Sequence, residues 1–233
     1  MGMVLSTTPI GEYDRRVVFL TKERGKMSAF AKGARKPGSA LGGKVMPFAF
    51  GEFTIYEGRT SNTVVSASVS NYFSEFREDV EAAYYGFYFL EIADYYCREG
   101  SDEREMLKLL YQSLRALISD KIPNRLVRCI YELKSICING EAPQVFQCVS
   151  CGDRSRPAQF SVKKGGRVCC ECDREVFDGM TLDVSTWHAL QYIVGTAVER
   201  LYTFTLTEPV LKELGMVIER YMDVYVEKSF KSV

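Results

Sequence analysis

The stretch Cys148-Val-Ser-Cys151-Gly152 is the first half of a motif that Gly165-Gly-Arg-Val-Cys169-Cys-Glu-Cys172 completes. Each half contains a CxxC pair, and 17 residues separate the two pairs. A CxxC turn places two sulfurs on one side of a metal ion, and an intervening hairpin brings the second pair across it. We therefore predict one structural Zn²⁺ bound by Cys148, Cys151, Cys169 and Cys172. Four protein ligands leave no open position for catalysis.

Other uses of these thiols are a disulfide pair, unrelated core thiols, or a redox CxxC, which would not require a second pair. Cys170 is interpreted as a non-ligand, because only one residue separates it from Cys172. Cys97, Cys129 and Cys137 fall on apolar faces of predicted helices, where a free thiol behaves as a small hydrophobic group. The chain shows no secretory signal, no apolar run that could span a bilayer and no secreted-type cysteine framework. These features predict a reducing compartment, the cytoplasm.

The charges of this 233-residue chain balance, with 30 basic and 30 acidic side chains, but they are unevenly distributed. Residues 15 to 44 contain nine basic side chains and a single acidic one, Glu23. A solvated surface usually mixes signs, whereas segregation of this kind is typical of a face that binds a polyanion such as nucleic acid. The nine are Arg15, Arg16, Lys22, Arg24, Lys26, Lys32, Arg35, Lys36 and Lys44.

The first 70 residues contain short runs of β-branched and aromatic residues separated by glycine-rich turns, which predict five strands. The long, basic, glycine-rich connection among them is typical of a small closed barrel of the OB type. Four aromatic residues of these strands fit the barrel core better than base-stacking positions, although the sequence alone does not separate inward from outward side chains: Phe19, Phe30, Phe53 and Tyr56. The expected strands are centred on residues 4–5, 17–20, 27–31, 53–56 and 63–69.

From Asp79 onward the apolar spacing becomes helical. One expected stripe runs from Val80 through Phe87 to Ala93, and another runs without interruption from Trp187 to Leu201. Thr207 is the expected N-cap of the last helix. The fold class is therefore α+β multidomain, with an N-terminal OB-fold barrel and a helical domain that carries a four-cysteine zinc-finger insertion. The expected domains are 1–78 (barrel), 79–145 plus 179–233 (helical) and 146–178 (zinc module).

Catalytic motifs are weak. Gly38–Lys44 resembles a phosphate-binding loop but lacks the Ser or Thr that would hold magnesium, and Pro47 interrupts the helix that should follow. His188 is the only histidine and is expected on a helix surface or core edge. The chain is therefore predicted to be neither an enzyme nor a nucleotide-binding protein.

Several short segments form a recognisable pattern along the chain. They are Gly11–Arg15, Thr21–Lys26, Ala31–Lys36, Met46–Phe48 ahead of Phe53–Glu57, Phe160–Gly166 and Glu227–Val233. Together with the four-cysteine module, they resemble the RecO family of bacterial recombination mediators over nearly the whole chain. The resemblance implies an OB barrel, a helical domain and a zinc element. One departure is a short N-terminus, which predicts a trimmed or irregular first barrel strand.

The resemblance also implies a non-enzymatic role in DNA repair and homologous recombination. Family members bind single- and double-stranded DNA, anneal complementary strands and, with RecR, help to load the recombinase onto DNA coated by single-strand-binding protein (SSB), whose C-terminal tail is a partner. A nucleoid-associated cytoplasmic location follows. The predicted DNA contacts are Lys26, Lys32, Arg35, Lys36 and Lys44, then Arg15, Arg16 and Arg59, with Arg15 or Arg16 also a candidate for a structural ion pair. The alternatives are a zinc-ribbon transcription or RNA-binding factor, or a metal-dependent enzyme.

Overall fold

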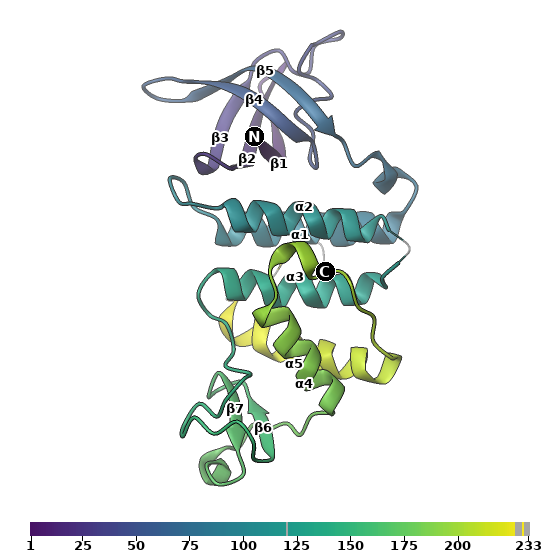
Figure 1. Cartoon of the computed structure of the whole chain (residues 1–233). Helices are drawn as coiled ribbons and strands as arrows, with labels where there is room; N and C mark the ends of the chain where they lie inside the picture. The colour runs from purple at the N-terminus through teal and green to yellow at the C-terminus, as the bar shows by residue number, and fades with distance from the viewer. Residues whose placement is uncertain (120, 227–229, 231–233) are drawn as a thin grey trace. The chain divides into compact units, whose positions relative to one another are not determined.

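A computed structural model describes residues 1–119, 121–226 and 230 of the chain (Figure 1). The chain divides into two compact units. The first comprises Met1–Leu114 together with Phe230, and the second begins at Arg115. Of the helices that the structure describes, none combines the length and apolar character that crossing a lipid bilayer requires.

The first unit begins with five strands that close into a barrel in the order β1-β2-β3-β5-β4. All neighbouring pairs are antiparallel except β3 and β5, which pair in parallel. In β3 every second residue is buried, so the two-residue period of the sequence separates core from exterior. The barrel and its five predicted strands are thus confirmed. The strands are β1 Gly2–Ile10, β2 Asp14–Thr21, β3 Gly25–Ala31, β4 Phe50–Glu57 and β5 Asn62–Asn71.

The first strand is complete, which corrects the expectation of a trimmed or irregular start. Gly2 already pairs with Thr21 of β2 and with Gly51 of β4. The register shifts only between Val4 and Ser6, inside the strand.

The barrel aromatics divide into two classes. Phe19 is fully buried and its ring lies 4.8 Å from that of Phe53, so these two belong to the core as predicted. Tyr56 is 67% exposed, and Phe30 is only half-buried. The interior assignment was therefore wrong for Phe30 and Tyr56. Ala29 and Ala31 occupy the inward positions beside Phe30, and Ile55 occupies the inward position beside Tyr56.

Helices complete the first unit: the 3₁₀ turn η1 Ser74–Arg77, α1 Val80–Tyr96, and α2 Arg104–Leu117, whose last residues belong to the second unit. The Asp79 side chain caps α1 by accepting from the Ala82 N–H at 2.9 Å. The stripe expected on α1 is partly wrong. Leu90 and Ala93 are buried, but Val80 and Phe87 are exposed.

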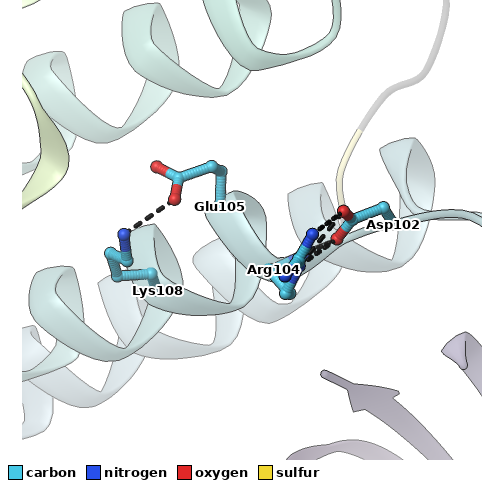
Figure 2. Close-up of polar contacts among 4 residues, drawn as sticks. All are labelled: Asp102, Arg104, Glu105 and Lys108. Atoms are coloured by element: carbon cyan, nitrogen blue, oxygen red, sulfur yellow. Dashed lines mark hydrogen bonds and ion pairs between the residues drawn. The ribbon is translucent and has the colours of Figure 1, made fainter. Parts of the chain in front are cut away.

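Two ion pairs at the start of α2 lie on its exposed side (Figure 2). Arg104 Nε donates to Asp102 at 2.8 Å, and Lys108 Nζ donates to Glu105 at 2.7 Å. Arg104 holds the pKa of Asp102 at about 2. Exposed pairs such as these contribute little to stability.

The second unit is built on α3 Asn124–Ile138, α4 Val184–Gly195 and α5 Glu208–Tyr225, which pack on one another. Helix α4 ends at Gly195, so the expected stripe to Leu201 is wrong in extent. The Lys134 ammonium of α3 binds the carbonyls of Ile193, Val194 and Thr196, which satisfies the last turn of α4. A separate 3₁₀ turn, η3 Val198–Arg200, follows. Thr207 occupies the N-cap position of α5 as predicted, but its side chain makes no capping hydrogen bond.

The cysteine-rich segment of the second unit forms a hairpin of β6 Ala158–Ser161 and β7 Gly166–Cys169, followed by the 3₁₀ turn η2 Asp173–Glu175. Gly165 and Gly166 have φ values of 72° and 151°, so the reversal between the two strands uses backbone conformations that favour glycine. A Cβ on Gly166 would lie 2.2 Å from the Gln144 carbonyl oxygen, which leaves room only for glycine.

Candidate nucleic-acid interface and metal centre

Strand register brings three connections to one end of the barrel. Arg15 of β2 pairs with Ala31, the last residue of β3. Phe30 pairs with Thr63 near the start of β5, and Thr63 pairs with Tyr56 near the end of β4. The β1–β2 turn, the connection after β3 and the β4–β5 turn therefore meet here. We call this region the basic end, and it carries Arg15, Arg16, Lys32, Arg35, Lys36 and Arg59.

Contacts between the β1–β2 turn and the connection after β3 fix the shape of the basic end. Arg35 Nη1 donates to the Gly11 carbonyl at 3.2 Å, and the Lys36 ammonium lies 5.3 Å from the centre of the Tyr13 ring. The Gly33 N–H donates to Asp14 at 2.7 Å. These contacts hold the backbone in place while the charged groups of Arg35 and Lys36 remain exposed.

The two adjacent arginines of β2 differ in their surroundings. Arg16 is exposed on the outer face of the barrel. Arg15 is half-buried and donates to Thr7 Oγ1 at 3.4 Å, and its buried Nε has no hydrogen-bond partner among the described residues. Arg15 therefore contributes to the barrel structure, although through a hydroxyl and not an ion pair, whereas Arg16 is available to a ligand.

Lys26 and Lys44 are the other predicted contacts in this part of the chain. Lys26 pairs with Leu20, four residues along β2 from Arg16, and its ammonium forms an ion pair with Asp94 of α1 at 3.3 Å. This partner offsets most of the charge that Lys26 would offer to a phosphate. Lys44 is half-buried in the long connection between β3 and β4, and it forms no ion pair with an acidic side chain in the part of the chain that the structure describes.

A row of side chains that includes the aromatic residues Phe30 and Tyr56 crosses the outer face of the barrel next to the basic end. We call it the aromatic row. Its members are cross-strand neighbours in register: Thr8, Arg16, Phe30, Thr63 and Tyr56. Tyr56 is the most exposed aromatic of this row. The sequence carried a signal for this placement, since strict alternation from the inward-facing Ile55 puts Tyr56 outside.

A polar hollow of about 440 Å³ lies beside the aromatic row on the exterior of β1, β2 and β3. Hydroxyl groups and cations form one side, and carboxylates of α1 and the segment after it form the other. The hydroxyl residues were absent from the sequence prediction, because serine and threonine are common on exposed strand faces. The polar lining consists of Ser6, Thr8, Ser28, Arg16, Lys26, Asp94 and Glu99.

The four predicted metal ligands converge in the second unit. The sulfur atoms of Cys148, Cys151, Cys169 and Cys172 all lie within 4.8 Å of one another. The distance between Cys151 Sγ and Cys169 Sγ is 3.6 Å, close to the edge of about 3.8 Å that a tetrahedron with metal–sulfur bonds of about 2.3 Å requires. Cys170 is exposed and lies outside this group, in agreement with its interpretation as a non-ligand. The four residues could hold a metal ion.

Hydrogen bonds from backbone N–H groups favour the negatively charged thiolate of Cys148, the form that binds a metal ion. Burial raises the pKa of Cys148, but N–H groups of Cys169, Cys151 and Ser150 outweigh it and bring the pKa down to about 6. The neighbouring Cys151 and Cys169 thiols raise the pKa of Cys172 to about 12. Four thiolates at this spacing repel one another, and a divalent cation removes that repulsion.

The two weak catalytic motifs lie in settings that do not suit catalysis. The segment from Gly38 to Lys44 consists of turns, and the described backbone after it enters no helix before β4, so the context of a nucleotide-binding loop is missing. His188 is exposed on α4.

Comparisons with known proteins match the order of these parts. The model of the N-terminal region of recombination protein O matches residues 1–73, and the model of its C-terminal region matches residues 77–233. This chain belongs to the RecO family. The DNA repair protein RecO of Acetivibrio thermocellus is 32% identical over 231 residues, which cover 98% of this chain and 92% of the relative. That of Alkaliphilus metalliredigens is 30% identical and covers 97% and 93%, and that of Bacillus pumilus is 29% identical and covers 99% and 90%.

The family assignment confirms the resemblance seen in the sequence, including the OB-like barrel, and places the chain among DNA repair proteins. One segment of that resemblance, Glu227–Val233, lies outside the described residues apart from Phe230.

Proposed function

We propose that this chain is a recombination mediator that binds single- and double-stranded DNA through the basic end of its barrel. The carrying observation is that strand register gathers exposed cations from separate segments of the chain at one end of the barrel. Lysine and arginine on such a surface neutralise phosphates and release condensed counterions, which gives affinity without regard to base sequence. The proposed contacts are Arg16, Lys32, Arg35, Lys36, Lys44 and Arg59, with smaller roles for Lys26 and Arg15.

The polar hollow extends this surface. Hydroxyl groups of Ser6, Thr8 and Ser28 lie with Arg16 around one depression, and such side chains commonly bind phosphate oxygens. We propose that the DNA backbone follows the outer face of β1 to β3 from the basic end into this hollow. Asp94 and Glu99 repel phosphate and mark where the path ends.

Tyr56 and Phe30 add an interaction that only single strands can use. A base stacked on an exposed aromatic ring contributes about 1–3 kcal/mol and requires little sequence preference. Because the stack engages a base face and leaves the Watson–Crick edge open, a bound strand can still find its complement. Strand annealing follows from this arrangement: charge concentrates two strands, stacking keeps them open, and the duplex product is held by phosphate contacts alone.

The remaining functional proposals follow from family membership. We propose that this RecO acts with RecR to load the recombinase onto SSB-coated single strands, that it binds the C-terminal tail of SSB, and that it works in the cytoplasm at the nucleoid without enzymatic activity. We also propose that the metal held by the four cysteines is a single Zn²⁺. A closed set of four thiolates supplies folding stability to the module and leaves no coordination site for a substrate.

A strand-annealing assay tests the central proposal. Two complementary labelled oligonucleotides, bare or coated with SSB, are mixed with the protein and the duplex is quantified over time. We expect sequence-independent acceleration that requires Lys32, Arg35 and Lys36. No acceleration, or binding restricted to one sequence or folded RNA, would overturn the mediator assignment and favour a zinc-ribbon regulatory factor.

A further inference from the structure

Helix α1 exposes an apolar stripe that neither the barrel nor the proposed DNA path uses. Val80, Tyr84 and Phe87 stand at helical positions i, i+4 and i+7, which places them on one face. They are 67%, 63% and 44% exposed. Together they present roughly 300 Å² of apolar surface, the size at which an exposed patch often marks an interaction site.

The stripe has a fixed shape because the connection before β4 packs under it. Phe48 adopts a left-handed backbone conformation with φ 72°, and its ring lies 4.7 Å from Phe87 and 4.9 Å from Phe76. A Cβ on Gly86 would lie 3.0 Å from the Phe48 ring, so glycine at this position permits the close approach. Phe48 thus supports one side of the Phe87 ring, and the rest of that ring faces solvent.

A small pocket of about 280 Å³ lies beside the stripe, next to Phe87. Leu5, Pro47 and Leu90 supply apolar lining, and Glu91 supplies a carboxylate. Ser6 and Asp94, which also line the polar hollow, complete the border between the two depressions, and Asp94 is paired with Lys26. The apolar part of the pocket suits one large apolar side chain.

The charge around the stripe identifies the class of partner. Between Tyr72 and Tyr95 the sequence contains six acidic residues and one basic residue, Arg77. Glu78 and Glu81 are exposed beside Val80. An acidic border repels nucleic acid and anionic lipid headgroups and attracts a basic protein surface. The apolar patch is small compared with the roughly 800 Å² that each partner buries in a standard interface, so it fits one helix better than a permanent dimer.

We propose that the α1 stripe is a docking site for an amphipathic helix of another protein, whose apolar face is bordered by lysine or arginine. The helix lays its apolar residues against Val80, Tyr84 and Phe87 and places one in the adjacent pocket, while its basic border meets Glu78 and Glu81. This site goes beyond the proposed DNA function, because the surface carries the opposite charge to the basic end.

The test uses two fluorescein-labelled helical peptides of 16 residues with leucine on one face. One has lysines along the border of that face, and the other has glutamates at the same positions. Fluorescence anisotropy with the full-length protein at moderate salt should show at least about tenfold tighter binding of the lysine peptide, with the preference shrinking as salt rises. Equal binding of the two peptides, or no binding of the lysine peptide, overturns the proposal.

Two double variants locate the site. Val80→Ser with Tyr84→Ser should weaken the lysine peptide at least about tenfold, and Glu78→Lys with Glu81→Lys should reverse the preference in favour of the glutamate peptide. Asp79 stays unchanged because it caps the helix. The serine variant should bind single-stranded DNA within about twofold of wild type, which separates this proposal from the DNA function. Unchanged peptide binding by the serine variant overturns the proposal. A dimer that sedimentation detects and that the same substitutions disrupt also overturns it, because a second copy of the chain would then occupy the stripe.

Discussion

Removing the charges of Lys32, Arg35 and Lys36 should flatten the salt dependence of DNA binding by a predictable amount. Each phosphate contact on single-stranded DNA contributes about 0.7 to the slope of log affinity against log salt. The six exposed or half-buried proposed contacts give a slope of about −4, so affinity should fall about 300-fold between 50 and 200 mM salt. The triple variant to glutamine should have a slope of about −2 and lose about 20-fold over the same range.

Folding should be nearly unchanged in this variant, because all three side chains are exposed. Within the protein, the substitutions remove the hydrogen bond from Arg35 to the Gly11 carbonyl and the interaction of the Lys36 ammonium with the Tyr13 ring. Interactions of this kind at the surface contribute about 1 kcal/mol or less each. Thermal denaturation verifies that the variant is folded before its affinity is compared.

The assay is fluorescence anisotropy of a labelled oligothymidine, and of a duplex, at four salt concentrations. The matched control neutralises Lys163 and Lys164, two exposed lysines in the turn of the cysteine-module hairpin. A triple variant that keeps the wild-type slope refutes the basic end as the DNA surface. If the control variant loses DNA binding while the triple variant binds normally, the DNA-binding surface lies on the cysteine module instead.

Three further substitutions test other parts of the structure. Tyr56→Ala should weaken single-strand binding by about 1–3 kcal/mol and leave duplex binding unchanged, whereas Tyr84→Ala, at another exposed tyrosine, should alter neither affinity. Cys148→Ser should abolish stoichiometric zinc by metal analysis and lower the unfolding temperature, whereas Cys170→Ser should retain the zinc, and a metal-free wild type would contradict the assignment. Gly166→Ala should destabilise the protein by at least about 2 kcal/mol in urea unfolding, because its Cβ would overlap the Gln144 carbonyl; a smaller loss would mean that this backbone can shift.

Much of the fold could be predicted because its signals are local. Alternation in β3 identifies a barrel strand from seven residues, and the paired CxxC spacing identifies four sulfurs that the structure brings within 4.8 Å. Helix α3 stops at Ile138, directly before Asn139 and Gly140, two residues that commonly end helices. In each case the physical constraint lies within a few neighbouring residues: a two-residue period, a turn, or a left-handed glycine.

The errors arose where distant contacts decide the outcome. Helix α1 is rich in apolar residues on every side, so periodicity alone does not choose the buried face, and Tyr88 and Phe89 are buried while Val80 is not. Helix α4 ends at Gly195, where Lys134, about 60 residues away in sequence, binds its last carbonyls, and no local pattern indicates this contact. The ion pair of Lys26 with Asp94, 68 residues further along, is likewise a long-range contact that the neighbouring residues do not indicate.

The same long-range pairing explains how a chain with no net charge can present two surfaces of opposite sign within its first unit. Cations accumulate where three connections meet at one end of the barrel, and carboxylates accumulate along α1. Lys26 and Asp94 form an ion pair between these two regions, so their opposite charges offset each other there. A phosphate backbone held at the basic end is therefore repelled from α1. If DNA and a basic protein helix bind this unit together, each should retain its own surface, because neither ligand gains by moving to the other site.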